Sequence, residues 1–283
     1  MNSEPSTYRI GGLTIEGKSR AGNETWFRVR ELGLSLDIGR CPDVLVGLSN
    51  ILVTHAHLDH ALGIPYYAAQ RRLYRLDAGN VFIPEEALED YRALMALHEK
   101  LEGTSYPLNL IGMKPGETHR LRRDLIVRAH RATHRVPARA WELCELRHKL
   151  RPELAKTSGP ELARMREAGE EIETWSEVPL IFYTGDTDRR LLEESTAIYQ
   201  ARVLIIECSF TAEGEEDRGR KYTHIHLSDL WEHADRFQNE FVMLTHFSLR
   251  DTPEQIHRRI RKEAPERLRD RLVLALPEPF QRL

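Results

Sequence analysis

Cysteine is scarce in this sequence, which has only three in 283 residues, Cys41, Cys144 and Cys208. Their odd number and wide separation argue against a disulfide framework and fit a reducing compartment. None of the three has the close pair spacing of a thiolate metal site. Disulfide-stapled scaffolds and thiolate-bound metal sites are therefore excluded as classes.

Long apolar runs are missing as well. No stretch approaches the roughly 20 apolar residues that span a bilayer, and the opening MNSEPSTYRI has neither the basic nor the apolar region of a signal peptide. We therefore expect a cytoplasmic protein with no membrane partner. The formal net charge of -3 is too small to predict a partner, so contacts with nucleic acid must come from local basic patches.

Neither an internal repeat nor a low-complexity linker divides the chain, and we predict one domain over residues 1–283. Short β-like runs alternate with helical periodicity, which is typical of an α/β fold. Strands are predicted at residues 8–15, 26–29, 34–38, 44–53 with a break near Ser49-Asn50, 108–113, 125–129, 180–184, 203–207, 241–245 and 272–276. Helices are predicted at residues 61–73, 85–101 and 253–262.

Residues 141–178 break this pattern, because charged residues dominate and no run of four apolar residues occurs. We predict a protruding insertion, mostly helical or irregular. Residues 147–166 hold six basic residues against Glu153 and Glu161, whereas residues 167–177 hold five glutamates and no base. The six are Arg147, Lys149, Arg151, Lys156, Arg164 and Arg166. A solvated helical hairpin and an RNA-binding arm both fit this composition.

Four polar segments share one placement, just past the end of a predicted apolar strand. They are residues 55–60, Asp186, Glu207 and His246. Loops at strand ends converge on one site because the sheet holds them in register. This placement predicts a metal site with more than one ion.

The stretch ILVTHAHLDH, residues 51–60, is the strongest local signal. Because His and Asp each number 13, the pattern H-x-H-x-D-H is expected by chance on the order of once in a thousand such chains. Neutral imidazole and carboxylate are ligands that suit zinc and similar divalent ions. Taken alone, His134 and His246 fit structural histidines about as well as ligands, and His130 is an alternative to His134.

Several segments carry a family resemblance. THAHLDH (54–60), His134, YTGDT (183–187) and LTHFS (244–248) resemble the successive metal motifs of the metallo-β-lactamase superfamily. LDIGRCP (36–42), KLRPELAKTSGPELARMREAGEEI (149–172) and KYTHIHLSDLWEHADRF (221–237) are similar to segments of the short form of tRNase Z, or ribonuclease Z, of plants and bacteria. The resemblance implies an αββα sandwich with a small helical arm inserted, and a tRNA 3′-processing endoribonuclease.

The resemblance also implies a ligand set for two Zn2+ ions, with Mn2+ or Fe2+ as alternatives. It assigns His55, His57 and His134 to one ion, Asp59, His60 and His246 to the other, and Asp186 to a bridge between them. Two ions about 3.5–4 Å apart can activate a water and clamp the oxygens of an in-line phosphoryl displacement.

Catalytic roles follow from the same resemblance. It implies that Asp59 orients the attacking water, and that Glu207 and a nearby histidine assist proton transfer to the leaving 3′ oxygen. We assign this histidine to His226, because HLSDL leads into a helix with Ser228 as N-cap, and keep His224 as the alternative.

Three further positions have two interpretations or depart from the family. Asp37 fits either a carboxylate behind the metal ligands or a turn residue before Gly39. Ala140-Trp141 stands where the family has Gly-Tyr, and ECSF (207–210) where it has Glu, small residues and threonine. The first departure bears on the shape of the substrate pocket.

The substrate is implied by the insertion. In the family an arm at this place grips tRNA, and Gly159-Pro160 among basic residues resembles it. Residues 120–135 add six arginines against Asp124, as phosphate clamps or a solvated face. Short-form relatives are homodimers in which one subunit's arm holds the tRNA for the other's site, and we expect a homodimer with precursor tRNA as partner.

Two rival functions are kept. The chain could be a dinuclear-metal hydrolase of a small phosphodiester or ester, with the arm as a lid or a dimer contact. It could also be a non-catalytic RNA-binding relative that keeps its metals. Di-iron redox chemistry is disfavoured, because such relatives place a carboxylate where His57 stands.

Overall fold

The computed structural model describes residues 4–283, and its strands form two sheets of seven strands each. In spatial order, the first sheet holds β1 (Ser6–Ile10), β2 (Leu13–Arg20), β3 (Glu24–Val29), β4 (Leu34–Leu36), β5 (Asn50–Leu52), β6 (Gly79–Pro84) and β7 (Leu108–Met113). The second holds β14 (Leu272–Leu274), β13 (Phe241–Thr245), β12 (Val203–Glu207), β11 (Glu173–Tyr183), β10 (Ala138–Leu150), β9 (Leu125–Ala132) and β8 (Thr118–Arg122).

Each sheet is antiparallel at one side and parallel at the other. Strands β4 to β7 are parallel, and so are β11 to β14. The parallel strands β12, β13 and β14 read as nearly continuous apolar runs because both faces of each are buried. In β12, Val203 and Ile205 face the core between the sheets, whereas Leu204 and Ile206 face the outer helices.

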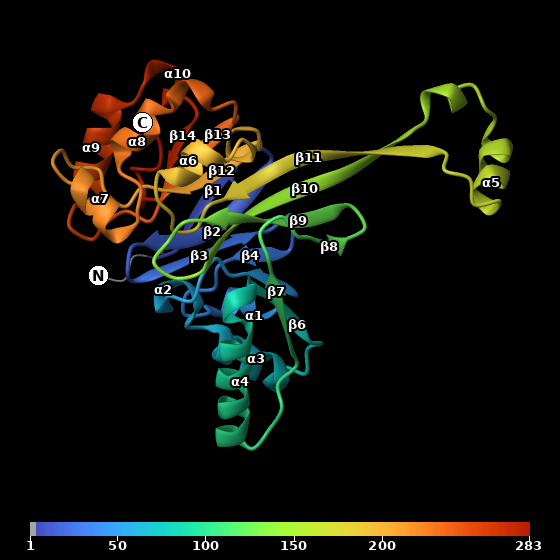
Figure 1. Ribbon diagram of the computed structural model, residues 1–283, viewed down its shortest axis with the longest axis horizontal. Helices are drawn as coiled ribbons and strands as arrows, with labels where there is room; N and C mark the ends of the chain where they lie inside the picture. Colours follow the sequence, from blue (N-terminus) through green and yellow to red (C-terminus); the bar gives the residue numbers. More distant parts are fainter. Residues whose placement is uncertain (1–3) are drawn as a thin grey trace.

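Helices cover the outer face of each sheet, and Figure 1 shows the four layers. The first sheet is covered by α1 (Asp43–Val46), α2 (Leu58–Ala61), α3 (Ile64–Leu73), the 3-10 turn η1 (Glu85–Ala87) and α4 (Leu88–Glu102). The second is covered by α6 (Arg190–Glu194), η3 (Ala197–Tyr199), α7 (Glu216–Tyr222), α8 (Leu227–Glu232), η4 (Ala234–Arg236), α9 (Pro253–Glu263) and α10 (Glu266–Arg269). The predicted αββα sandwich is confirmed.

Local sequence accounts for well-defined helix ends. At α9, Thr252 accepts from the backbone N–H of Gln255, whose side chain accepts from the N–H of Thr252. This capping box satisfies two amides that a helix start leaves unpaired. Ile256 and Ile260, four residues apart, then point into the core.

Two of the expected strands near the N-terminus are wrong in detail. Residues 8–15 do not form one strand: Gly11 and Gly12 have positive φ and make a two-residue turn between β1 and β2. The first part of the expected strand at residues 44–53 is the short helix α1, and only the part after the expected break near Ser49-Asn50 is a strand, β5. An apolar run of this length fits a buried helix as well as a strand.

The insertion at residues 141–178 is a long two-stranded ribbon, so the expectation of a mostly helical or irregular segment is wrong. Strands β10 and β11 pair from Trp141 opposite Tyr183 to Leu150 opposite Glu173. Strand β9 pairs with β10 only as far as Glu145, so the ribbon leaves the sheet at residue 146. We call residues 146–177 the arm.

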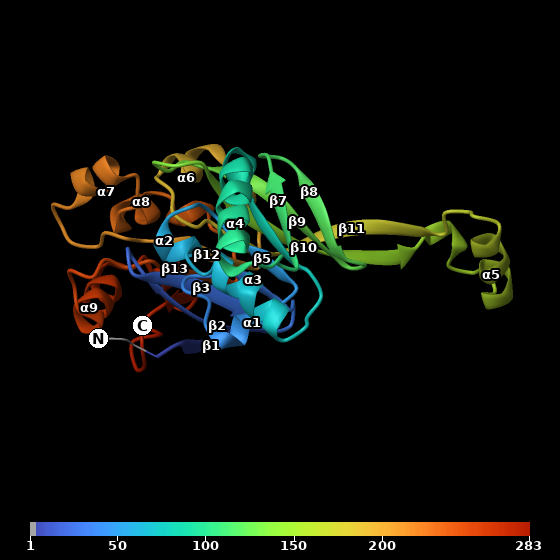
Figure 2. The ribbon, with the colours of Figure 1, turned by 90° about the horizontal axis from the view of Figure 1, so that it is seen from below.

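The helical part of the arm is confined to its tip, which holds η2 (Pro152–Leu154) and α5 (Gly159–Glu167). Figures 1 and 2 show the tip held far out from the sandwich. Both faces of the ribbon are largely solvated, which explains why its sequence lacks the apolar alternation of a buried strand. Within residues 4–283, no helix is long and apolar enough to cross a membrane.

Candidate metal centre

The parallel strands of the second sheet deliver three polar side chains to one edge. Strand β11 ends at Tyr183 and Asp186 follows it, Glu207 is the last residue of β12, and His246 follows β13. Because neighbouring parallel strands have their carboxyl ends on the same side, these side chains come together. The sheet therefore brings Asp186, Glu207 and His246 together at one edge, as their positions after apolar strands predict.

The other contributors come from the facing sheet and from one turn. Residues 55–60 follow β5, and His57 is the residue before the first turn of α2. His134 lies in the turn between β9 and β10, and a bridge between His55 and Ala138 joins that turn to the β5 loop. The candidate site thus spans both sheets of the sandwich.

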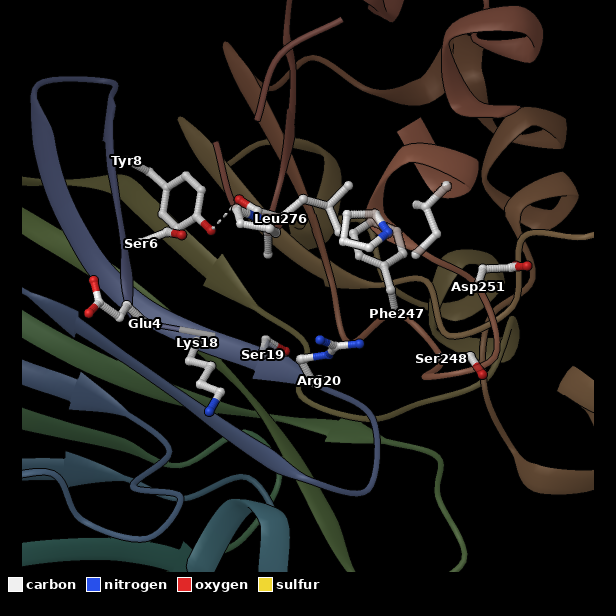
Figure 3. A pocket seen from close by; sticks show the side chains of 15 residues that line it. Glu4, Ser6, Tyr8, Lys18, Ser19, Arg20, Phe247, Ser248, Asp251 and Leu276 are labelled. Atoms are coloured by element: carbon white, nitrogen blue, oxygen red, sulfur yellow. Dashed lines mark hydrogen bonds between the residues drawn. The ribbon is translucent and has the colours of Figure 1, made fainter. Parts of the chain in front are cut away.

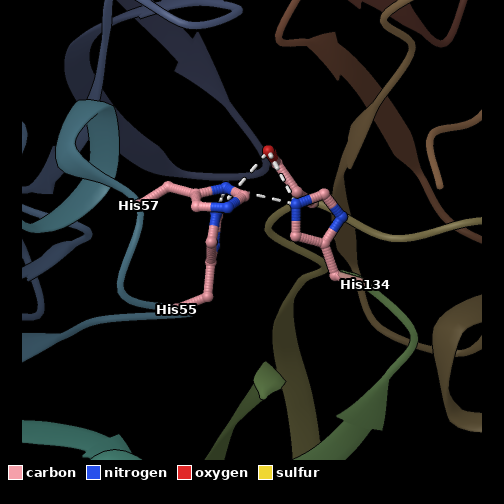
Figure 4. A group of neighbouring side chains, drawn as sticks. His55, His57 and His134 are labelled. Carbon is pink, nitrogen blue, oxygen red and sulfur yellow. Dashed lines mark hydrogen bonds and ion pairs between the residues drawn. The ribbon is translucent and has the colours of Figure 1, made fainter. Parts of the chain in front are cut away.

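A first group of donors is formed by His55, His57 and His134, which Figure 4 labels, together with Asp186. His57 Nδ1 lies 3.0 Å from His55 Nε2 and 3.3 Å from His134 Nε2. Donors bonded to zinc at about 2.0–2.1 Å in a tetrahedron are roughly 3.3–3.4 Å apart. The three nitrogens therefore have the spacing of ligands to one ion.

A second group is formed by Asp59, His60 and His246. His60 Nε2 lies 3.4 Å from His246 Nε2, and Asp59 Oδ2 lies 3.6 Å and 3.5 Å from these two nitrogens. The backbone N–H of Gly22, in the β2–β3 turn, donates to Asp59 Oδ2 at 2.8 Å. This bond fixes the carboxylate at the mouth of the site.

Asp186 links the two groups with one oxygen toward each. Its Oδ2 lies 3.7 Å from His55 Nε2 and 4.0 Å from His134 Nε2. Its Oδ1 lies 3.4 Å from His60 Nε2 and 3.3 Å from His246 Nε2, and no hydrogen bond to this buried atom is found within residues 4–283. A buried carboxylate oxygen without a partner is costly, and a cation would satisfy it. The residues therefore fit a site for two ions, with Asp186 placed between the two donor groups.

Outer hydrogen bonds set which ring nitrogen of each histidine faces the site. The Nδ1 of His60 donates to Asp37, that of His134 to the carbonyl of Thr223, and that of His246 to Ser209 Oγ. Similarly, His55 Nδ1 bonds Thr54 Oγ1 at 3.0 Å. With Nδ1 carrying the proton, Nε2 of these four histidines is free for a metal ion.

Asp37 is the centre of this outer layer. It is fully buried at positive φ after β4, and it accepts hydrogen bonds from His60 Nδ1 at 2.7 Å and from the Tyr183 hydroxyl at 2.6 Å. It also accepts from the backbone N–H of Thr54 at 2.7 Å. Of the two interpretations of Asp37, the structure supports the carboxylate behind the ligands.

Burial and charge shift the pKa values of the donor residues in different directions: burial would lower the pKa of His60, but the carboxylates of Asp186 and Asp37 raise it well above its usual value. Burial lowers the pKa of His55 and His134, which keeps these imidazoles neutral. Burial would raise the pKa of Asp186, but the charges of His246 and His60 outweigh it and hold this pKa well below its usual value. Divalent cations bind ionised carboxylates and neutral imidazoles, so an ion here would bind the ionised Asp186 and displace the proton of His60.

Glu207 contacts His224 rather than His226. Its Oε1 lies 2.7 Å from His224 Nδ1, and its Oε2 accepts from the hydroxyl of Ser209 at 2.7 Å. The His224 ring stacks on His246 at a centroid distance of 5.4 Å and lies 5.1 Å from the His134 ring. His224 therefore sits between the two donor groups.

The structure places His226 elsewhere, so the choice of His226 over His224 does not fit the geometry. The His226 side chain accepts from the N–H of Ser228 and caps α8, while its Nε2 bonds the carbonyl of Ala212 at 2.9 Å. His226 is thus itself the N-cap, the role expected of Ser228. The sequence could not separate these two histidines, which are only two residues apart, because their partners Glu207 and Ala212 come from another segment of the chain.

The structure also shows where His130, Trp141 and Ser209 lie relative to the site. His130 pairs with Glu142 at 2.8 Å and lies outside both donor groups, so the geometry favours His134. Trp141 is fully buried between the sheets, so the Ala140-Trp141 departure changes the core and not the substrate pocket. Ser209, which touches Glu207, His224 and His246, was not identified from the sequence, and its only signal was its position two residues after Glu207.

A cavity of about 30 Å³ lies between β2 and the segment after His246 (Figure 3). Lys18, Arg20 and Asp251 are among the residues that line it. This volume holds only a few water molecules, so the cavity is too small for a substrate. It lies behind the site, where Ser19 Oγ accepts from the backbone N–H of His246 at 3.0 Å.

The family comparison agrees with the fold and the donor groups. The profile of the beta-lactamase superfamily domain matches residues 29–247. The protein is therefore an αββα member of this superfamily with a His/Asp cluster consistent with a dinuclear metal site. The resemblance noted in the motifs is confirmed.

Closer relatives narrow the class. tRNase Z TRZ1 of Arabidopsis thaliana is 32% identical over 276 residues, which cover 96% of this chain and 94% of that protein. The chloroplastic tRNase Z TRZ2 of the same plant is 35% identical over 278 residues, covering 96% and 77%. The chain belongs to the tRNase Z family of hydrolytic, metal-dependent nucleases. The human short-form tRNase Z has the same fold, with a TM-score of 0.58 at 17% identity over 83% of this chain and 92% of that one.

Proposed function

We propose that this chain is a zinc-dependent endoribonuclease that removes the 3′ trailer from precursor tRNA by phosphodiester hydrolysis. The observation that carries the proposal is the 32% identity to a protein named tRNase Z over nearly the full length of both chains. The two donor groups, with Asp186 between them, support the same function. Fold alone would not name a substrate, since this architecture hosts several reactions.

The donor set suits Zn2+, because five imidazole nitrogens and two carboxylates are its preferred ligands, with Mn2+ and Fe2+ as alternatives. Ions held here would lower the pKa of a water and neutralise charge on the scissile phosphate. In the proposal, Asp59 accepts a hydrogen bond from the attacking water. The Gly22 N–H at 2.8 Å holds Asp59 in position for this.

We assign proton transfer to the leaving 3′ oxygen to Glu207 and His224. Burial would lower the pKa of His224, but the Glu207 carboxylate 2.7 Å away raises it to about 9, so the imidazole carries a proton at neutral pH. A protonated His224 between the donor groups can donate to the departing oxygen. The products would be a tRNA with a 3′-hydroxyl and a trailer with a 5′-phosphate.

The arm is the feature that supports a long substrate. Strand β10 starts beside His55, and its 13 residues reach the tip about 40 Å away at about 3.3 Å per residue. At the tip, Gly159 and Pro160 open α5, where the N–H groups of Glu161 and Leu162 bond the carbonyl of Ser158, so contacts with phosphate would come from basic side chains. A small diester is too short to contact both a metal centre and an arm tip, whether of one subunit or of two, whereas a folded RNA can.

The basic character of the arm is partly neutralised within it. Arg147 pairs with Glu145 at 2.7 Å, and Arg151 pairs with Glu153 at 2.6 Å. Arg166 lies 2.5 Å from Glu173. In the described part of the chain, Lys149, Lys156 and Arg164 have no carboxylate within 4.0 Å and would supply the phosphate contacts.

We further propose a homodimer, in which the arm of one subunit holds the tRNA for the site of the other. An apolar face on α2, α3 and α4 supports a second copy as partner, because large apolar side chains stand exposed around a groove of about 380 Å³. The exposed side chains are Leu58, Leu62, Tyr66, Leu94, Leu97 and Leu101. Light scattering of the wild type should give twice the chain mass, and Leu58→Lys with Leu94→Lys should give a monomer.

The decisive experiment incubates Zn2+-loaded protein with 3′-extended tRNA. Asp59→Ala is expected to bind this RNA without cutting it. Deleting residues 147–172 leaves 173–176 to connect Leu146 with Glu177, which face each other in the ribbon, and should keep hydrolysis of bis-p-nitrophenyl phosphate while losing the precursor. A wild type that cuts only the small diester would support the small-substrate hydrolase. One that binds RNA and cuts neither would support the non-catalytic rival.

Localisation in the cytoplasm stays a prediction, since one of the relatives is chloroplastic by name.

A further inference from the structure

Three cationic side chains surround the ring of Tyr222, the last residue of α7. The guanidinium carbons of Arg135 and Arg218 lie 5.7 Å and 5.9 Å from the ring centroid, and Lys221 Nζ lies at 5.6 Å. We call these four residues the Tyr222 cluster. Arg135 and Lys221 are exposed, so a ligand from solvent can reach them.

The three cations have no carboxylate partner. Among residues 4–283, no Asp or Glu oxygen lies within 4.0 Å of their charged nitrogens, whereas Arg220 of the same helix pairs with Asp217 at 3.3 Å. Three like charges around one ring repel each other, and the negative face of the ring offsets only part of that repulsion. An anion bound among them would remove it.

The Tyr222 cluster adjoins the metal centre through two segments of chain. Arg135 directly follows His134, whose Nδ1 donates to the carbonyl of Thr223 at 3.1 Å. His224, two residues after Tyr222, holds Glu207. The cluster therefore lies beside the donor groups on the side where His224 stands.

We propose that the Tyr222 cluster binds backbone phosphates of the RNA next to the scissile bond, on the side of the leaving 3′ oxygen. This rests on the proposed function, which assigns that oxygen to His224. Guanidinium groups take phosphate oxygens in pairs, and the lysine adds a compact charge. The cluster thus sets the position of the strand that becomes the new tRNA 3′ end.

The test compares Arg218→Ala, Lys221→Ala and their double variant with Arg220→Ala, a matched control on the same helix. Arg135 is left in place because it adjoins His134. Steady-state cleavage of 3′-extended tRNA is measured across a salt series. Each single cluster variant should raise KM several-fold and reduce the slope of log KM against log salt by about 0.7–1, and the double variant should reduce it by about twice as much, whereas Arg220→Ala should change neither.

Binding without cleavage separates this proposal from the proposed function. The same substitutions are placed in Asp59→Ala, and binding of fluorescein-labelled 3′-extended tRNA is followed by anisotropy. Weaker binding with a smaller salt slope supports the cluster even if the wild type fails to cut. The proposal is overturned by unchanged binding and KM, by an equal effect of Arg220→Ala, or by an equal loss of activity on bis-p-nitrophenyl phosphate, which has no neighbouring phosphates.

Discussion

Asp37 orients the metal-centre residue His60 without belonging to either donor group, and replacing Asp37 by asparagine tests this role directly. The carboxylate is fully buried and accepts from His60 Nδ1, the Tyr183 hydroxyl and the N–H of Thr54, at 2.6–2.7 Å. An asparagine presents one amide NH2 in place of an acceptor. At least one of the three groups that donate to Asp37 must then face the amide NH2, which is also a donor.

The expected loss has two parts. A hydrogen bond to a buried charged group contributes about 1.5–3 kcal/mol, so Asp37→Asn should lower the free energy of unfolding of the metal-free protein by about 2–4 kcal/mol. With Nδ1 of His60 no longer held, the affinity for Zn2+ should fall about 10- to 100-fold. Urea unfolding measures the first part, and competition with a chromophoric chelator measures the second.

Tyr183→Phe is the matched control, because it removes one hydrogen bond to Asp37 and leaves His60 in contact with the carboxylate. Burial raises the pKa of Tyr183 well above its usual value, so the phenol donates at neutral pH and its loss should cost about 1–2 kcal/mol of stability. Zn2+ affinity should stay close to that of the wild type. If Asp37→Asn also binds Zn2+ as the wild type does, the carboxylate does not orient His60 and the reasoning fails.

Three further outcomes are expected. Gly185→Ala should lower the free energy of unfolding by about 2–3 kcal/mol, because Gly185 has φ +55° and a Cβ there would lie 2.5 Å from Thr54. The variant should also bind less zinc, measured by atomic absorption, and normal metal content would contradict this. Burial would raise the pKa of Glu142, but His130 and Arg128 lower it, so its ion pairs stabilise the fold above the unfolded pKa near 4.5 and are lost as pH falls through the folded value. Urea titrations in chelator should therefore show an advantage over Glu142→Gln of about 1–2 kcal/mol at pH 6 that vanishes in acid, and an advantage constant with pH would refute it. Removing bound metal with EDTA should lower Tm by about 5–10 °C, since ions that bind only the native state stabilise it by about 4 kcal/mol at a thousandfold excess over Kd; an unchanged Tm in calorimetry would argue against a resident metal.

The apolar runs of the buried strands were readable in the sequence, because a strand covered on both faces needs apolar residues throughout. Residues 203–207 and 241–245 were predicted with the bounds that β12 and β13 have. The polar residues that end these runs, Asp186, Glu207 and His246, therefore stood out as site candidates. The arm ribbon escaped prediction because neither of its faces is buried, so no period of two marks its strands.

Contacts between distant segments were beyond the reach of the local pattern. His60 and His246 are 186 residues apart, and only the packing of one sheet on the other brings their Nε2 atoms to 3.4 Å. The same packing turns His224 toward Glu207 and leaves His226 as a helix cap, although both lie in one short motif. The sequence HAHLDH by itself identifies metal-binding side chains. The residues that complete the two donor groups are set by how the two sheets pack on each other, which no local pattern encodes.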